Sequence, residues 1–273
     1  MQPFHHLPDI PLVDGRVNFI LDQCRGKRVL HLGCVDAGLL ADRYARGELL
    51  HQKLAAVSAD LWGVDVDAPG IAFMQGQGFP QLVVGDVCDL ATFARLGDVR
   101  FDVILASEVV EHLLNPGLFF DAVKTVMAPG HTTLIVTVPN AFRISTLLWL
   151  RHGVEYVHPD HNYWFSYYTA TNLMQKCGFA VDAVFMYTHE KRVGLSRPVR
   201  RLLGQRQSAG APAAAGDAGD KATAVTTAGS RSALYLRTLP RRLLAAAFFH
   251  NGPFWGDGVI VIARLPVHGP ATT

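Results

Sequence analysis

The sequence predicts an α/β protein built on a doubly wound, mainly parallel sheet. Short apolar runs rich in Val, Ile and Leu alternate with longer stretches whose apolar residues have helical spacing. We expect strands at 28–33, 60–67, 81–86, 101–106, 132–139, 179–187 and 258–265. We expect helices at 38–54, 69–77, 115–127, 141–153 and 169–177. This alternation is typical of βαβ units, in which helices cover both faces of the sheet.

Length and composition limit the classes of protein that the chain can belong to. Its 273 residues suit one large α/β domain, or one domain with an appendage. Hydrophobic residues make up 49% of the chain, so a sizeable core can form. The formal net charge of +2 indicates neither a polyanion binder nor an acidic tail, so nucleic acid is not expected as a partner.

The cysteines and the first residues indicate a cytoplasmic protein. The four cysteines are far apart and form no Cys-x-x-Cys pair, which favours reduced thiols over disulfides or a zinc site. The opening MQPFHHLPDI lacks the basic and apolar regions of a signal peptide. No apolar run reaches the roughly 18 residues that a membrane span needs.

We expect three parts along the chain: a core at 1–190, an insertion at 191–257, and the last core strand with its tail at 258–273. Within the insertion, 208–230 is rich in Ala and Gly and poor in large apolar residues, which predicts a flexible linker. Basic apolar segments at 191–206 and 231–249 flank it. These segments either contact an anionic membrane surface or pack as ordinary helices against the sheet.

Small and acidic residues follow several of the predicted strands. The stretch VLHLGCVDAG at 29–38 places Gly33 and Gly38 after the first strand, where a tight turn lets backbone approach a ligand. Asp65 and Asp67, in GVDVD, lie at the end of the second strand, where a carboxylate can accept hydrogen bonds from ribose hydroxyls. The carboxyl ends of these strands are therefore the expected ligand-binding edge.

The most distinctive stretch is SEVVEHLLNPG at 107–117, directly after the fourth strand. Glu108, Glu111 and His112 have i, i+3 and i+4 spacing, which on a helix places them on one face. Two carboxylates and a neutral imidazole suit Mg²⁺ or Mn²⁺. A further ligand is available in HPDHNYWFS at 158–166.

These stretches together resemble the class I S-adenosylmethionine-dependent methyltransferases, over about residues 20–190 and the last strand. The resemblance implies a Rossmann-like seven-stranded sheet in the order 3-2-1-4-5-7-6, with strand seven antiparallel. It implies S-adenosyl-L-methionine as cofactor, and places Asp86 at the adenine amino group with Val87 beside it. The implied cofactor-binding residues are Gly33, Cys34, Asp36, Gly38, Asp65, Asp86, Val87 and Ser107.

The Glu-x-x-Glu-His segment is similar to that of the small-RNA 3′-end and ubiquinone-synthesis O-methyltransferases. Carried over, this similarity implies a metal held by Glu108, Glu111, His112 and His161, with His158 as a lesser neighbour. Two alternatives stay open. One is a metal-free role in which His112 or His161 acts as general base, and the other is a structural role for all four residues.

The resemblance implies an O-methyltransferase of a hydroxylated small molecule or glycan. Its alternatives are a metal-free N- or O-methyltransferase of a secondary metabolite, and a non-catalytic scaffold with a methyltransferase-like fold. The scaffold stays open because Val35 and Ala37 stand where the family usually has glycines, and His31 where it usually has an acid.

Overall fold

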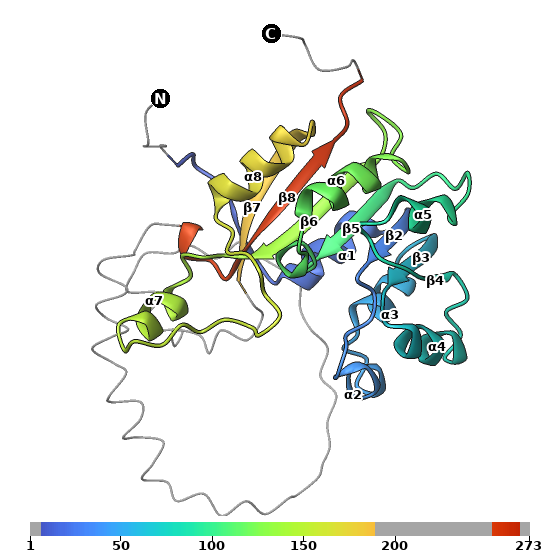
Figure 1. Ribbon diagram of the computed structural model, residues 1–273, viewed down its shortest axis with the longest axis horizontal. Coiled ribbons are helices and arrows are strands. Elements are labelled where there is room, and N and C mark those ends of the chain that lie inside the picture. Colours follow the sequence, from blue (N-terminus) through green and yellow to red (C-terminus); the bar gives the residue numbers. More distant parts are fainter. Residues whose placement is uncertain (1–6, 189–252, 268–273) are drawn as a thin grey trace, which may run out of the picture. The chain divides into compact units, whose positions relative to one another are not determined.

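The computed structural model describes residues 7–188 and 253–267, which form a single eight-stranded sheet covered by helices (Figure 1). The strands are β1 (Leu12–Asp14), β2 (Arg28–Leu32), β3 (Asp60–Asp65), β4 (Leu82–Val84), β5 (Val103–Ser107), β6 (Thr133–Pro139), β7 (Ala180–Thr188) and β8 (Gly258–Arg264). The helices are α1 (Arg16–Cys24), α2 (Leu40–Ala45), α3 (Leu50–Ala55), α4 (Ala68–Gly76), α5 (Leu90–Ala94), α6 (Pro116–Lys124), α7 (Ile144–Leu150) and α8 (Tyr167–Lys176). Two 3-10 helices, η1 (Val110–His112) and η2 (Pro253–Trp255), complete the described elements.

The strand order is β1-β7-β8-β6-β5-β2-β3-β4, and β8 runs antiparallel to both of its neighbours. The α/β class is confirmed, but the predicted count of seven strands is wrong. The additional strand β1 pairs in parallel with β7 at the edge of the sheet, so the predicted order lacks one strand. With three residues between Pro11 and Gly15, β1 is too short to show an alternating pattern.

One helix prediction is corrected, and the helices α1 and α5 were not predicted. The helix expected at 38–54 is two helices, α2 and α3, because Gly47 takes a φ of 67° between them. Such a left-handed residue ends a helix, and glycine adopts it without a steric cost. The short helix α5 was not predicted, although Asp89 caps it by accepting a hydrogen bond from the Ala91 amide at 2.9 Å.

Separate apolar cores cover the two faces of the sheet. On one face, α5, α6 and α8 contribute Phe93, Phe119, Phe120 and Met174. On the other face, α1 and α3 contribute Ile20, Cys24 and Leu54. Successive residues of β2 alternate between the cores, since Val29 belongs to the second and Leu30 to the first. The sheet is therefore doubly wound, and its central strands β2, β5 and β6 are buried on both faces (Figure 1).

The predicted insertion 191–257 lies outside the described residues, except for 253–257. The same is true of the linker 208–230 and of the basic segments 191–206 and 231–249. Among the described helices, none is long and apolar enough to cross a bilayer. The described ranges belong to one structural unit, which comprises Met1–Glu190 and Pro253–Thr273.

Candidate active site

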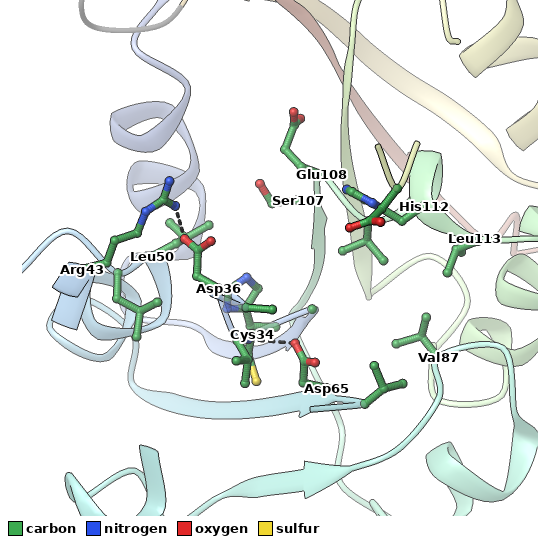
Figure 2. Close-up of a pocket in the computed structure, with 18 of the residues that line it drawn as sticks. Cys34, Asp36, Arg43, Leu50, Asp65, Val87, Ser107, Glu108, His112 and Leu113 are labelled. Atoms are coloured by element: carbon green, nitrogen blue, oxygen red, sulfur yellow. Dashed lines mark hydrogen bonds and ion pairs between the residues drawn. The ribbon is translucent and has the colours of Figure 1, made fainter. Parts of the chain in front are cut away.

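A pocket of about 680 Å³ opens at the carboxyl ends of β2, β3 and β5 (Figure 2). Most of the predicted site residues line it: Gly33, Cys34, Asp36, Asp65, Asp86, Val87, Ser107, Glu108, His112 and His161. Two predicted residues, Gly38 and Glu111, are not among its lining residues. The pocket lies where an open parallel sheet is expected to bind a ligand.

The loop after β2 passes close to the turn after β5. Gly33 has a φ of 69°, and a Cβ on it would lie 2.5 Å from Cγ2 of Val109. Its amide donates a hydrogen bond to the Val64 carbonyl at 2.9 Å, which ties the loop to β3. Gly38 also has a positive φ, of 77°, but it is exposed and has no heavy atom near its missing Cβ. Gly38 therefore serves the turn rather than a close approach to a ligand.

Asp65 is held rigidly at the end of β3. Its carboxylate accepts hydrogen bonds from the amides of Val35, at 2.8 Å, and Asp67, at 3.0 Å. Burial raises the pKa of Asp65, and these two amides oppose that shift. Asp67 has a different role, because it caps α4 by accepting from the Gly70 amide at 3.0 Å. Asp65 rather than Asp67 thus faces the pocket with an oriented carboxylate.

The remaining predicted cofactor residues surround Asp65. The thiol of Cys34 is buried, and burial and Asp65 raise its pKa, so the thiol stays neutral. Asp36 forms an ion pair with Arg43 across the mouth of the pocket (Figure 2). Asp86 is exposed, and it accepts a hydrogen bond from the Cys88 amide at 2.8 Å.

Glu108 is the centre of a buried polar network. One of its oxygens, Oε1, pairs with Nη1 of Arg16 at 3.0 Å and accepts hydrogen bonds from the hydroxyls of Thr137, at 2.8 Å, and Tyr187, at 2.9 Å. The same guanidinium nitrogen also donates to Oγ of Ser107 at 3.2 Å. Glu108 has a φ of 58°, a left-handed conformation that costs a non-glycine residue about 1 kcal/mol. Three donors on one carboxylate oxygen offset that strain.

Glu111 differs from Glu108 in its burial, its hydrogen bonding and its pKa. Its side chain is fully buried, and neither carboxylate oxygen has a hydrogen-bond partner among the described residues. Burial, and then the charge of Glu108, raises the pKa of Glu111 to about 9. Glu111 is therefore protonated at neutral pH in the structure as it stands.

The predicted common face of Glu108, Glu111 and His112 does not form. Glu108 is left-handed and precedes η1, which is a 3-10 helix rather than the expected α-helix. The three side chains consequently diverge: Glu108 joins the Arg16 network, Glu111 is buried, and His112 lines the pocket. The structure thus does not bring the four predicted metal ligands into one group.

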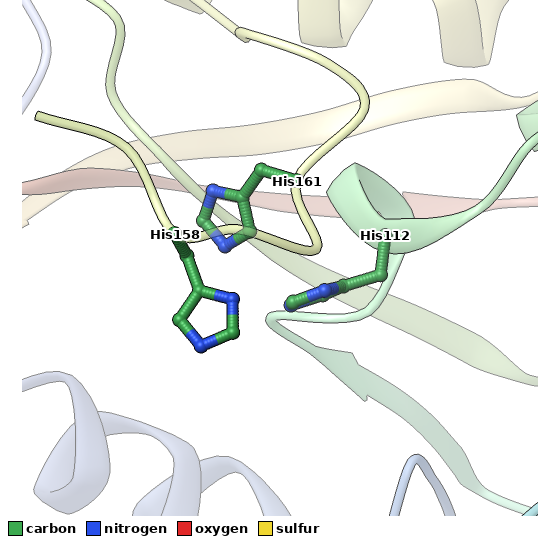
Figure 3. Close-up of side chains that lie close together, drawn as sticks. All are labelled: His112, His158 and His161. Carbon is green, nitrogen blue, oxygen red and sulfur yellow. The ribbon is translucent and has the colours of Figure 1, made fainter. Parts of the chain in front are cut away.

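Three histidines meet instead. The rings of His112, His158 and His161 lie close together, and one nitrogen of each ring lies within 4.8 Å of one nitrogen of the other two (Figure 3). The centroids of His112 and His161 are 4.6 Å apart. Burial is the main cause that lowers the pKa of both His112 and His161. The neighbouring ring lowers it further, which is His158 for His112 and His112 for His161. Neutral imidazoles of this kind can accept a proton or donate a lone pair to a metal.

Hydrogen bonds between two loops explain why His161 reaches His112. The amide of Asn162 donates to the carbonyl of Glu111, and its side-chain nitrogen donates to the carbonyl of His112, both at 2.8 Å. The hydroxyl of Tyr163 donates to the carbonyl of Leu114 at 2.9 Å. These contacts attach the HPDHNY segment to the turn after β5, across about 50 residues of sequence.

Sequence reasoning missed Arg16. It lies at the start of α1, is largely buried, and lines the pocket together with its partner Glu108. Its Nε is buried without a hydrogen-bond partner among the described residues. No local pattern singles out this arginine, because its partners Ser107, Glu108 and Thr137 are about 90 to 120 residues away.

A separate pair of buried histidines, His31 and His51, lies next to the pocket, which only His31 of the two lines. Nδ1 of His31 lies 3.3 Å from Nδ1 of His51, and both side chains are buried. Burial, then His51 and Arg16, lowers the pKa of His31 well below its usual value, and burial lowers that of His51 from 6.5 to about 4. Both rings are therefore neutral near pH 7, and one must donate a hydrogen bond to the other.

This pair predicts a loss of stability in mild acid. Below pH 6.5 the unfolded chain binds protons that the buried rings do not, so the free energy of unfolding falls as the pH drops from about 6.5 to about 4. The part of this loss due to His51 is on the order of 2–3 kcal/mol. Urea unfolding at pH 7.5 and 4.5 should show a smaller loss in His51→Leu. The exposed control His152→Gln should keep the full loss, and an equal loss in both variants would contradict the assignment.

Comparison with known proteins agrees with this geometry. The model of the methyltransferase-domain family matches residues 5–184, well over half of the chain, and the protein belongs to that family. A SAM-dependent methyltransferase from Archaeoglobus fulgidus superposes with a TM-score of 0.50 at 15% identity, covering 91% of each chain. A small RNA methyltransferase superposes with a TM-score of 0.51 at 16% identity, covering 93% of this chain and 25% of the other. At these identities, the structural likeness concerns the fold alone.

Curated relatives are similar over part of their length. A ubiquinone biosynthesis O-methyltransferase of Paraburkholderia phymatum is 27% identical over 160 residues, or 57% of this chain and 61% of the relative. A protein of the same name from Azorhizobium caulinodans is 32% identical over 135 residues, which are 49% of this chain and 48% of the relative. The chain therefore spans about half to three fifths of the length of these relatives.

Proposed function

We propose that this protein transfers a methyl group from S-adenosyl-L-methionine to a hydroxyl of a small molecule. The observation that carries the proposal is that residues from the ends of β2, β3 and β5, chosen from sequence as cofactor contacts, line one pocket around an oriented Asp65. The curated relatives, named as O-methyltransferases, support a hydroxyl acceptor. A glycan, the other acceptor class that the resemblance implies, remains an alternative.

The lining residues suggest how the cofactor would be held. Asp65 can still accept hydrogen bonds from two ribose hydroxyls, because each carboxylate oxygen has more than one acceptor site. Asp86 and Val87 lie on the adenine side, as the resemblance implies. Arg16 also lines the pocket, and its positive charge and its Nε, which has no hydrogen-bond partner among the described residues, suit the cofactor's carboxylate.

Methyl transfer from a sulfonium is an in-line displacement. The acceptor oxygen forms a bond to the methyl carbon, the carbon–sulfur bond breaks, and the oxygen loses its proton. The protein must position the hydroxyl and receive that proton. His112 and His161 line the pocket as neutral imidazoles, so either is suited to receive it. Glu108 is less suited, because its Oε1 already accepts from three donors.

A divalent metal fits the histidines of the site better than its carboxylates. His112, His158 and His161 offer three neutral nitrogens close together, whereas Glu108 is engaged with Arg16. Imidazole ligands favour borderline ions such as Zn²⁺ over Mg²⁺ or Mn²⁺. Glu111 is not part of this group, because it is buried and does not line the pocket. When bound, a metal would lower the pKa of an acceptor hydroxyl.

This fit predicts an order of metal affinities. Calorimetric titration should show Zn²⁺ binding at one site and Mg²⁺ binding at least about 100-fold more weakly. His158→Ala should weaken Zn²⁺ binding by about tenfold or more, and the exposed control His152→Ala should leave it unchanged. Equal affinities for Zn²⁺ and Mg²⁺ would instead favour the carboxylate site. Binding unaffected by His158→Ala would remove this histidine from the ligand set.

The proposed activity is tested by following a labelled methyl group. Protein and methyl-labelled S-adenosyl-L-methionine are incubated with vicinal diphenols, single phenols, a sugar mixture, primary amines and a short RNA. We expect label on a small-molecule hydroxyl, with at least about 100-fold slower transfer in His112→Ala. Label on an amine or on RNA would overturn the proposed acceptor. Tight S-adenosylhomocysteine binding without transfer to any acceptor would favour the non-catalytic scaffold.

A further inference from the structure

Helix α7 exposes an unusual number of large apolar side chains. Its last four residues, Leu147, Leu148, Trp149 and Leu150, are 36%, 42%, 47% and 49% exposed, and we call them the α7 tip. Phe142, Val154 and Tyr156 beside it are 55%, 43% and 56% exposed. Single exposed apolar residues are common on proteins, but a continuous group usually marks a binding surface.

The arrangement of the α7 tip indicates what kind of partner it fits. Successive helix residues are about 100° apart, so four in a row point almost all the way round the axis. A protein partner would cover one side of such a helix and leave the others in water. A helix that is apolar on all sides is best accommodated by surroundings that enclose it. The headgroup and acyl boundary of a bilayer does this, and it does not require a membrane span.

Cationic and aromatic groups lie at the base of the tip. The Trp149 and Tyr156 rings stack, with centroids 6.1 Å apart, and Cζ of Arg143 lies 5.6 Å from the Tyr156 centroid. Arg143 donates hydrogen bonds from Nε to the Thr146 hydroxyl at 2.8 Å and from Nη2 to the Tyr156 carbonyl at 3.4 Å, and neither Arg143 nor Arg151 forms an ion pair with a described carboxylate. Amphipathic aromatic rings favour the membrane–water interface, and unpaired arginines favour anionic lipid headgroups.

We propose that the α7 tip inserts into the surface of an anionic lipid bilayer and anchors the protein there peripherally. The apolar side chains enter the acyl boundary, Trp149 and Tyr156 lie at headgroup level, and Arg143 and Arg151 contact lipid phosphates. This surface is distinct from the basic segments 191–206 and 231–249, which sequence reasoning had singled out for membrane contact. The inference does not depend on methyl transfer, so its test is a binding test.

The test is co-sedimentation of the full chain with vesicles of phosphatidylcholine, alone or with 30% phosphatidylglycerol. We expect binding to the anionic vesicles, and a partition coefficient lower by about tenfold or more in the double variant Leu148→Asn, Trp149→Asn. The control is Leu118→Asn on α6, whose side chain is similarly exposed at 52%. It should bind as the wild type does. Far-ultraviolet circular dichroism checks that all variants are folded.

Fluorescence adds a second measurement. Vesicles should shift the tryptophan emission of the wild type to shorter wavelength, and Trp149→Phe should lose most of that shift while keeping its binding. Failure of the wild type to bind anionic vesicles would overturn the proposal, and so would undiminished binding of the double variant. Self-association that the double variant abolishes, without vesicle binding, would assign the tip to a second copy of the chain instead.

Discussion

Asp65→Asn is expected to weaken S-adenosylhomocysteine binding about 100-fold, or about 2.8 kcal/mol. Under the proposed function, this carboxylate accepts the ribose hydroxyls while two amides, from Val35 and Asp67, fix its orientation. An amide group in its place loses the negative charge and presents an N–H₂ where an acceptor is needed. The hydrogen bond that residue 65 accepts from the Val35 amide, in the loop after β2, also weakens. The pocket therefore loses order as well as a ligand contact.

Calorimetric titration measures the effect, and the neighbouring acid supplies a matched control. Asp67 lies two residues away but caps α4, and Asn is as good a cap as Asp. Asp67→Asn should therefore leave both the affinity and the melting temperature nearly unchanged. If both variants lost affinity equally, the assignment of the ribose contact to Asp65 would be wrong.

Glu108→Gln is expected to lower the free energy of unfolding by about 2–3 kcal/mol. The change leaves the Arg16 guanidinium largely buried without its counter-charge, and breaking such a pair usually costs more than the pair itself contributes. The expected loss is smaller than for a fully buried pair, because the two side chains remain 19% and 25% exposed and water screens their charges.

Urea unfolding of a double-mutant cycle tests this expectation. Arg16→Met should be destabilising as well, but the double variant Arg16→Met, Glu108→Gln should recover part of the stability, because it leaves no unpaired charge. The exposed pair of Arg28 and Asp60 serves as comparison, and Asp60→Asn should cost less than about 1 kcal/mol. Strictly additive effects of the Arg16 and Glu108 changes would contradict the proposed coupling.

The strands β2 to β8 were predictable because each lies in an apolar run that is rich in Val, Ile or Leu and stands between helical stretches. The edge strand β1 was not, since three residues carry no periodicity and its pairing with β7 joins positions about 170 residues apart. The division of 38–54 into α2 and α3 depends on the φ of Gly47, which a helical pattern does not reveal. Short elements and backbone reversals are thus where local patterns failed.

The site likewise has features that the sequence predicts and features that depend on distant contacts. The positions of Asp65 and His112 at strand ends follow from the parallel sheet itself. The left-handed backbone of Glu108 does not, because it depends on donors from Arg16, Thr137 and Tyr187 that are distant in sequence. This backbone conformation directs Glu108 to Arg16 and away from the face that holds His112. The close group in the structure is therefore the three imidazoles, and tertiary contacts rather than the i, i+3, i+4 spacing decide which side chains lie together.

The central claim is that the pocket at the carboxyl ends of β2, β3 and β5 holds S-adenosyl-L-methionine. The most direct measurement is a calorimetric titration of the wild-type chain with S-adenosylhomocysteine and, separately, with NADH, a dinucleotide that other Rossmann-like folds bind. We expect one site for S-adenosylhomocysteine and a dissociation constant at least about 100-fold higher for NADH. We also expect a crystal structure with bound S-adenosylhomocysteine to show the ribose on Asp65. Absence of S-adenosylhomocysteine binding, or a preference for NADH, would contradict this claim.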